Sequence, residues 1–230
     1  QANQIATTID AMNSASIGDH RIDSTAVAVT HKSAADTKSS NSFVLTGSKG
    51  ASTISFTKGD GVKTVAAAVN TATSSTGVTA QAVTHARLDT LNSAGTVSFT
   101  LTGASGTGTA ISASIVNASD LTNLRDAINQ VAGTTGITAK FGATNATIDL
   151  TDHDGDDIHI DNFASTATNA TMQVTALDFA GTTEVGSAVN LQDDISSATQ
   201  DANITGTLRL TDTQSFTVRT ETETDGSTAP

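Results

Sequence analysis

The sequence contains no cysteine, no tryptophan and no tyrosine, and its single proline is the last residue. Without cysteine the chain has no disulfides and no thiolate metal sites, so nothing is lost when it passes from a reducing to an oxidising compartment. Aromatic residues make up only 3% of the chain, so any core must be built from Val, Ile, Leu and Ala. The 230 residues suffice for one large domain or for a few small, thin-cored units.

Basic residues are also scarce, because 11 Lys and Arg stand against 23 Asp and Glu, giving a formal net charge of −12. Such a chain repels phosphate backbones and anionic lipid headgroups, so we expect neither nucleic acid nor a membrane surface as a partner. No apolar run approaches the roughly 20 residues that a spanning helix needs, and no signal peptide opens the chain. We therefore expect either export without a cleaved signal or a chain cut from a longer parent.

What the sequence does contain is a repeat with a period near sixty residues. GVKTVAAAVNTATSSTGVTA at 61–80 aligns without a gap with DLTNLRDAINQVAGTTGITA at 120–139. In each copy, apolar residues spaced by 3, 4 and 3 lie on one stripe of a helix, and a glycine turn and a strand follow. The two stripes consist of Val62, Val65, Val69 and Ala72, and of Leu121, Leu124, Ile128 and Val131.

A third copy of this helix is expected at residues 1–12, where the same stripe is formed by Ile5, Ile9 and Met12. Asp60 and Ser119 occupy equivalent positions before the other two helices, where a side-chain oxygen can accept hydrogen bonds from first-turn amides. The equivalent position in the first copy precedes Gln1. We therefore interpret this copy as truncated.

Short alternating segments predict strands with one buried face, and strands so close in sequence should pair antiparallel. The predicted strands are 26–29, 43–45, 53–56, 78–83, 97–101, 111–116, 137–141, 146–150 and 158–160. No further helix of this type follows residue 164, and strands are predicted at 172–177, 185–191, 206–210 and 215–218. The last two read as a hairpin with its turn at 211–214.

The sequence thus predicts an α+β fold, mostly antiparallel β, with three short amphipathic helices in tandem β-α-β-β repeats and a β-rich closing segment. The expected divisions are a truncated first repeat at 1–47, a second repeat at 48–103, a third at 104–163 and the closing segment at 164–230.

Helices that end in AVN or AIN, followed by TGVTA or TGITA and two strands, resemble the flagellin hook IN motif. That motif occurs in the outer, variable domains of bacterial flagellins, of the D2 and D3 type, and in some hook-associated and filament-cap proteins. The closing GTLRLTDTQSFTV at 206–218 is similar to a hairpin near the end of many flagellin variable regions. The resemblance implies a structural component of the flagellar filament that is extracellular, surface-exposed and involved in motility, and that is exported through the flagellar channel.

Flagellins polymerise through long terminal helices, and the sequence shows no heptad-bearing helix of that kind. The resemblance therefore implies that neighbouring flagellin subunits meet through regions of a parent chain outside this sequence, and we expect the chain alone to be monomeric. The alternatives are an outer domain of a filament-cap or hook-associated protein, and a filament-displayed adhesin or carbohydrate-binding module. The absence of Trp and Tyr leaves few aromatic platforms for the last of these.

The sharpest chemical cluster is DLTDHDGDDIHID at 149–161. Asp152, Asp154 and Asp156 alternate as oxygen ligands do at the start of an EF-hand loop, but Asp157 and Phe163 occupy the places of the required Gly and Glu. We expect a solvated acidic hairpin turn, with a weak Ca²⁺ site as the alternative. A calorimetric titration that shows neither heat nor a thermal shift at millimolar Ca²⁺ would exclude that ion.

His159 shares a strand face with Asp157 and Asp161, which we interpret as a solvent-facing polar row rather than a zinc site. His31 and His85 occupy equivalent places in the repeated AVTH and read as polar strand-end residues.

Motifs of catalysis and phosphate binding are missing from the sequence. GASGTG at 103–108 is followed by neither Lys nor a helix, so we interpret it as a connector. No G-x-S-x-G or HExxH motif occurs. We expect no catalytic residue, no cofactor and no metal ligand.

Overall fold

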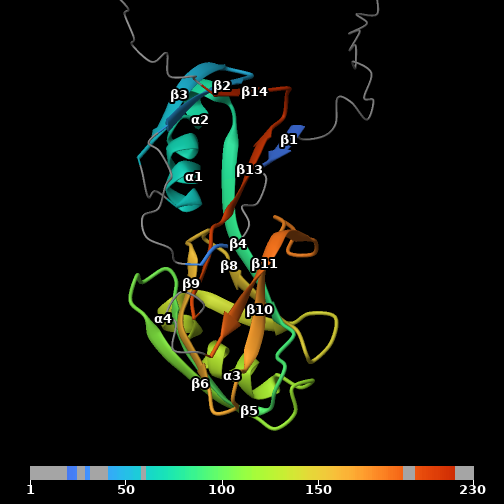
Figure 1. Cartoon of the computed structure of the whole chain (residues 1–230). Coiled ribbons are helices and arrows are strands. Elements are labelled where there is room, and N and C mark those ends of the chain that lie inside the picture. The colour runs from blue at the N-terminus through green and yellow to red at the C-terminus, as the bar shows by residue number, and fades with distance from the viewer. Residues whose placement is uncertain (1–19, 25–28, 32–40, 58–60, 194–199, 221–230) are drawn as a thin grey trace, which may run out of the picture.

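The computed structural model describes residues 20–24, 29–31, 41–57, 61–193 and 200–220, which form two lobes stacked end to end (Figure 1). The upper lobe contains residues 20–24, 41–57, 61–83 and 207–220, and the lower lobe contains residues 29–31, 84–193 and 200–206. The long strand β4 (Thr79–Asp89) runs through both. The strands pair antiparallel and the helices are few, which confirms a mostly antiparallel α+β fold.

Three sheets make up the two lobes. The upper lobe has the order β14-β2-β3, formed by Thr217–Thr220, Asn41–Gly47 and Gly50–Phe56. The lower lobe has the order β12-β9-β5-β6, formed by Ala202–Ile204, Ile158–Ser165, Gly95–Thr102 and Thr109–Ile115. A seven-stranded sheet extends through both lobes in the order β1-β13-β4-β10-β11, formed beside β4 by His20–Asp23, Thr207–Asp212, Thr171–Leu177 and Glu184–Gln192. Its remaining strands are β8 (Ile148–Asp152), which pairs with β4, and β7 (Ile137–Phe141), which pairs with β8.

Each lobe has one helix pair, in agreement with the predicted apolar stripes. In the upper lobe α1 (Val62–Thr71) continues into α2 (Thr73–Thr76), and in the lower lobe α3 (Thr122–Gln130) continues into α4 (Ala132–Thr135). Their buried stripe residues include Val69 in α1 and Leu124 and Ile128 in α3. The helix expected at 1–12 lies outside the described residues.

The predicted cap at Ser119 is wrong. The N-cap position of α3 is Leu121, and the carboxylate of Asp120 accepts hydrogen bonds from the backbone N–H and the hydroxyl of Thr122. The N–H of Ser119 instead donates to the side chain of Asn117, because a turn intervenes between β6 and the helix. Asp60, the equivalent predicted cap, lies outside the described residues.

The two lobes have separate apolar cores. The upper core gathers Phe43, Leu45, Ile54, Val69, Val78, Leu210 and Phe216 between the three-stranded sheet, the helix and β13. The larger lower core includes Phe99, Leu101, Ile128, Leu150, Ile160 and Phe163 and gathers residues from the four-stranded sheet, α3 and the lower part of the seven-stranded sheet. The described residues thus form two cores without a shared member, so each lobe packs as a unit.

Both lobes are built from the same sequence of elements. In the lower lobe the hairpin β5-β6, the helices α3-α4 and the strands β7 and β8 follow one another, and β9 then pairs with β5. In the upper lobe the hairpin β2-β3, the helices α1-α2 and the strands β4 and β13 take these places, and β14 pairs with β2. Residues 90–206 separate β4 from β13, so the lower unit is inserted into the upper one.

This nesting explains two wrong predictions. Leu210-Thr211-Asp212 ends β13 as Leu150-Thr151-Asp152 ends β8, and in both cases the chain then crosses to the other sheet of its lobe. Residues 206–218 therefore do not form a hairpin, and neither do residues 149–161. The predicted repeats, which end at residues 47, 103 and 163, were assigned from similarity along the sequence. This division into repeats stays a prediction.

An asparagine joins helix to strand in each lobe. The side chain of Asn129 donates to the carbonyl of Ala139 and accepts from its N–H, both at 2.8 Å. Asn70 makes the same two bonds to Ala80, at 2.9 and 2.8 Å. These bonds satisfy backbone groups of the strand that the helix covers.

We expect Asn129→Ala to lower the free energy of unfolding by about 1–2 kcal/mol, because it leaves a strand N–H and carbonyl without their partner. Chemical denaturation measures the change, and Gln130→Ala, one residue further along the same helix, is the control. Equal stability of the two variants would contradict the assigned role of Asn129.

Candidate functional site: the junction between the lobes

The strands beside β4 change where the two lobes meet. β8 ends with Asp152 opposite Thr84, and β13 begins with Thr207 opposite Val83. The hydroxyl of Thr84 donates to the carbonyl of Asp156 at 2.7 Å, and that of Thr207 donates to the carbonyl of Val83 at 3.2 Å. The first bond holds β4 to the loop after β8 within the lower lobe, and the second holds it to β13 within the upper lobe.

A glycine allows the loop after β8 to approach β4 closely. Gly155 has a φ of 80°, and a Cβ placed there would lie 2.3 Å from the Cβ of Ala82. Only glycine combines this conformation with this contact.

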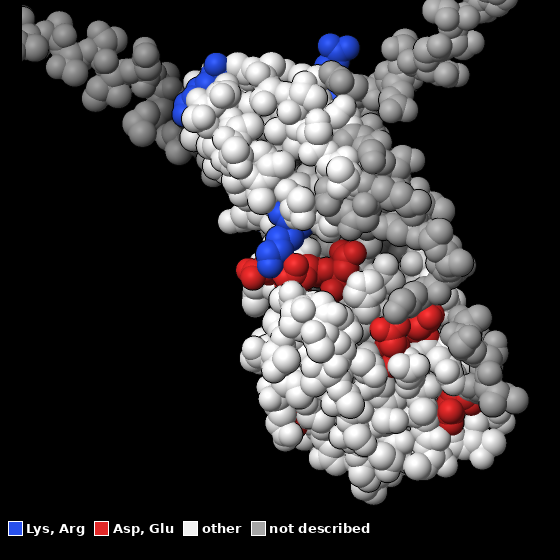
Figure 2. All heavy atoms as spheres, turned by 90° about the vertical axis from the view of Figure 1, so that its left-hand side faces the viewer, with Lys and Arg blue, Asp and Glu red and all other residues white. Residues whose placement is uncertain are grey.

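An ion pair connects the lobes on the side of α1. The ammonium of Lys63 lies 2.7 Å from a carboxylate oxygen of Asp156 and 3.7 Å from one of Asp154. The hydrogen bond to Asp156 raises the pKa of Lys63, which keeps it charged. Figure 2 shows a lysine of the upper lobe meeting carboxylates of the lower lobe at the waist of the molecule.

A second contact between the lobes involves Arg209 of β13. Its guanidinium lies 3.8 Å from the ring centroid of Phe179, in the loop between β10 and β11. The same guanidinium donates to Asp23 of β1 at 2.7 and 2.9 Å. Arg209 thus ties the β1 edge strand of the upper lobe and the lower lobe together.

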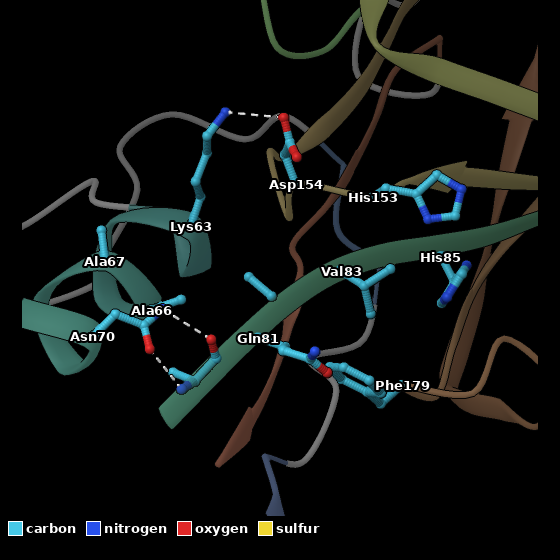
Figure 3. A pocket seen from close by; sticks show the side chains of 12 residues that line it. Lys63, Ala66, Ala67, Asn70, Gln81, Val83, His85, His153, Asp154 and Phe179 are labelled. Carbon is cyan, nitrogen blue, oxygen red and sulfur yellow. Dashed lines mark hydrogen bonds and ion pairs between the residues drawn. The ribbon is translucent and has the colours of Figure 1, made fainter. Parts of the chain in front are cut away.

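An open groove of about 650 Å³ lies between these two contacts. Figure 3 shows it along β4, with Lys63 and Asp154 on one side of the strand and Phe179 on the other. His85 and His153 line the end of the groove that lies toward the lower lobe, at the right of Figure 3. Burial lowers the pKa of His85, with smaller contributions from Lys140 and His153, so this imidazole is neutral at pH 7.

The predicted solvated acidic turn is wrong for two of its carboxylates. Asp149 and Asp152 are only 5% and 1% exposed, because β8 lies between β4 and β7. Asp149 forms a two-pronged ion pair with Arg87 of β4, at 2.8 and 3.3 Å. Asp154, in contrast, is largely exposed, as predicted.

The three calcium candidates are engaged in different contacts. One oxygen of Asp152 accepts the backbone N–H groups of Asp154 and Asp156, at 3.0 and 3.2 Å, and the carboxylate of Asp156 pairs with Lys63. Among the residues that the structure describes, no group of three or more His, Asp or Glu is arranged to hold a metal ion. The calcium alternative stays a prediction for the titration given above.

The other residues singled out in the sequence lie in separate places. On β9, Ile158 and Ile160 are fully buried while His159 and Asp161 on the other face are partly exposed. His31 lies 2.9 Å from the carbonyl of Asp201. Residues 103–108 connect the paired strands β5 and β6, as expected of a connector.

Asp152 and Asp212 occupy equivalent positions in the two lobes but differ in their partners. The oxygens of Asp212 accept hydrogen bonds from the N–H and hydroxyl of Ser48 and from the N–H of Gln214. The second oxygen of Asp152 has no hydrogen-bond partner among the described residues. Burial disfavours the charged form of both carboxyl groups. For Asp152 burial prevails and raises the pKa. For Asp212 the hydrogen bonds to Ser48, Thr213 and Gln214 together outweigh burial and lower the pKa.

These opposite shifts predict opposite effects of two matched substitutions. At pH 7 we expect Asp152→Asn to leave stability unchanged or raised, because ionisation of Asp152 is unfavourable in the fold above its raised pKa. We expect Asp212→Asn to lower the free energy of unfolding by about 1–2 kcal/mol, since it weakens charge-assisted hydrogen bonds.

Thermal unfolding as a function of pH checks this pair. The stabilisation from Asp212 is present above the ordinary pKa of 3.8 and is lost as the pH falls through its lowered value. The penalty from Asp152 develops as the pH rises from 3.8 through its raised pKa. A loss of stability at pH 7 for Asp152→Asn as large as that for Asp212→Asn would contradict the assignment.

Part of the chain matches a known protein family. Residues 42–94 match the family model of the flagellin hook IN motif, and they span β2, β3, α1, α2 and β4 of the upper unit. The equivalent elements of the lower lobe lie outside the matched segment. No curated protein matches the chain.

In the part of the chain that the structure describes, no helix has the length and apolar character needed to cross a membrane. The similarity of the chain to a known family rests on the motif in the upper unit. Residues 42–94 thus carry a flagellin hook IN motif, which relates this part of the chain to flagellins.

Proposed function

We propose that the chain forms surface-exposed outer domains of a flagellin-type filament subunit. The observation that carries this proposal is the hook IN motif at 42–94, which builds the upper unit of the two-lobed body. The role is structural: the domains add bulk and charge to the filament surface during motility, and no group reacts.

The path of the chain supports an outer position. The first and last described strands, β1 and β14, both belong to the upper lobe (Figure 1). The lower lobe is inserted between β4 and β13, apart from residues 29–31, where Thr30 pairs with Asn203. The lower lobe therefore projects away from the place where the chain enters and leaves the body. A domain held to a filament core at one end has this arrangement, with neighbouring subunits joined through regions of the parent chain outside this sequence.

The charge distribution supports the same orientation. Residues 84–206 contain 14 Asp and Glu but only three Lys and Arg, which amounts to −11 of the net charge of −12. The projecting lobe is thus acidic, whereas the described residues of the lobe at the attachment end contain five Lys and Arg and only two Asp. Densely arrayed acidic lobes repel one another and stay hydrated, which suits an extracellular surface and a monomeric outer domain.

Immunogold electron microscopy tests the proposal. Antibodies raised against this chain are applied to intact cells of the organism that encodes it, with and without competing purified chain. We expect gold along the whole length of the flagellar filaments, and competition should remove it. Label confined to the filament tip would favour a cap protein, label confined to the hook junction a hook-associated protein, and flagella without label would overturn the proposal.

A further inference from the structure

We propose that the two lobes are hinged at Val83 and Thr84 of β4, and that the ion pair between Lys63 and Asp156 holds them in the closed pose. The hinge and the ion pair are properties of this chain alone, and the proposal does not depend on the proposed function.

The position of the hinge follows from the strands beside β4. Up to Val83 β4 pairs with β13, whereas from Thr84 onwards it pairs with β8 and, from Ala86, also with β10. The flanking strands therefore do not run continuously past this point. The hydroxyl bond of Thr84 stays within the lower lobe and that of Thr207 stays within the upper lobe, so neither of them spans the break.

The separate cores allow the lobes to move as bodies. Most buried apolar residues of the described chain fall into two clusters, one in each lobe, and Val83 at the hinge belongs to neither. A rotation about Val83 and Thr84 leaves both clusters packed, so it exposes little apolar surface. The polar contacts across the groove then decide which orientation is favoured.

Lys63 is placed to act as the latch. It projects from α1 of the upper lobe toward Asp154 of the lower lobe (Figure 3). Asp156 is fixed on the lower lobe by its backbone bonds to Asp152 and Thr84. Asp154 adds a second carboxylate at 3.7 Å. Exposed ion pairs contribute about 0–1 kcal/mol, too little to determine the fold but enough to shift two poses of similar energy.

The lack of cysteine makes the hinge measurable. Ser55 in β3 and Ser114 in β6 are exposed, one in each lobe, so Ser55→Cys with Ser114→Cys gives the full chain two labelling sites. Single-molecule energy transfer between dyes at these sites reports the ratio of open to closed molecules.

We expect Lys63→Glu to raise this ratio about five- to thirtyfold, because repulsion replaces attraction at the latch. Lys63→Gln, which only removes the charge, should raise it about two- to fivefold. Salt at molar concentration should also raise the ratio of open to closed molecules of the chain without the Lys63 substitution, since it screens exposed charges. Lys49→Glu, in the exposed β2-β3 turn of the same lobe, is the matched control and should change nothing.

Charge exchange separates a latch from a general effect of charge. Lys63→Glu combined with Asp156→Lys restores the opposite charges in reversed order and should return the ratio to that of the parent. The proposal is overturned if Lys63→Glu and Lys63→Gln both leave the distance distribution unchanged, if Lys49→Glu changes it equally, or if the exchanged pair stays open.

Discussion

Replacing Arg87 with methionine is expected to lower the free energy of unfolding by about 3–5 kcal/mol, the largest effect of any single substitution considered for this protein. Arg87 lies directly opposite Asp149 on the neighbouring strand β8, and its guanidinium meets both carboxylate oxygens. Methionine retains an apolar stem but no donor. The substitution therefore leaves a charge on Asp149, only 5% exposed, without its counter-ion.

Two further variants identify the cause of this loss. Glu184 also pairs with Arg87 at 2.9 Å but is half exposed, so Glu184→Gln should cost less than about 1 kcal/mol. Replacing both partners, with Arg87→Met and Asp149→Leu, removes the buried charge and should recover most of the stability. Chemical denaturation compares the variants. A loss for Arg87→Met no larger than that for Glu184→Gln would show that the burial of Asp149 does not matter.

The helices could be predicted because their pattern is local. The stripes of α1 and α3 repeat every three or four residues, and the helices begin and end within a few residues of the predicted bounds. The hairpins β2-β3, β5-β6 and β7-β8 follow equally from neighbouring alternating segments. Such elements are determined by residues that are close in sequence.

The insertion of the lower unit into the upper one could not be predicted in this way, because it depends on strands that pair although they lie far apart in the sequence. β13 pairs with β4 across more than a hundred residues, and the short strand β1 is stabilised by an equally distant partner, β13. One signal was nevertheless present: Leu-Thr-Asp occurs at 150–152 and again at 210–212. Treating these as equivalent would have assigned β13 the role that β8 has in the lower unit.

The junction was foreseen only in part for the same reason. The cluster at 149–161 was recognised as acidic, but the partners that divide it come from elsewhere: Arg87 from β4 and Lys63 from α1. Alternating carboxylates suggested equal ligands for an ion. Partners from distant parts of the sequence instead give the carboxylates different roles. Asp149 forms a buried ion pair with Arg87, Asp152 accepts hydrogen bonds from the backbone of the following turn, and Asp156 pairs with Lys63.

Gly103→Ala is expected to cost about 3 kcal/mol, because the hairpin and the helix turn of the lower lobe meet at this residue. An added Cβ would lie 2.4 Å from the carbonyl oxygen of Thr135 and 2.8 Å from the Cδ1 of Ile137. That carbonyl cannot easily move away, since it accepts the N–H of Ala104 at 2.9 Å. Chemical denaturation again gives the change.

Gly133→Ala is the matched control, since no atom outside its own helix neighbourhood lies within 4 Å of the added Cβ in α4. It should be neutral or stabilise by up to about 1 kcal/mol through helix propensity. Gly47 occupies the position of Gly103 in the upper lobe, with its Cβ 2.3 Å from the carbonyl oxygen of Thr76. Similar losses for Gly47→Ala and Gly103→Ala, beside an unchanged Gly133→Ala, would show that one close contact between hairpin and helix turn constrains both units. A loss in one lobe alone would mean that the other relaxes around the added methyl group.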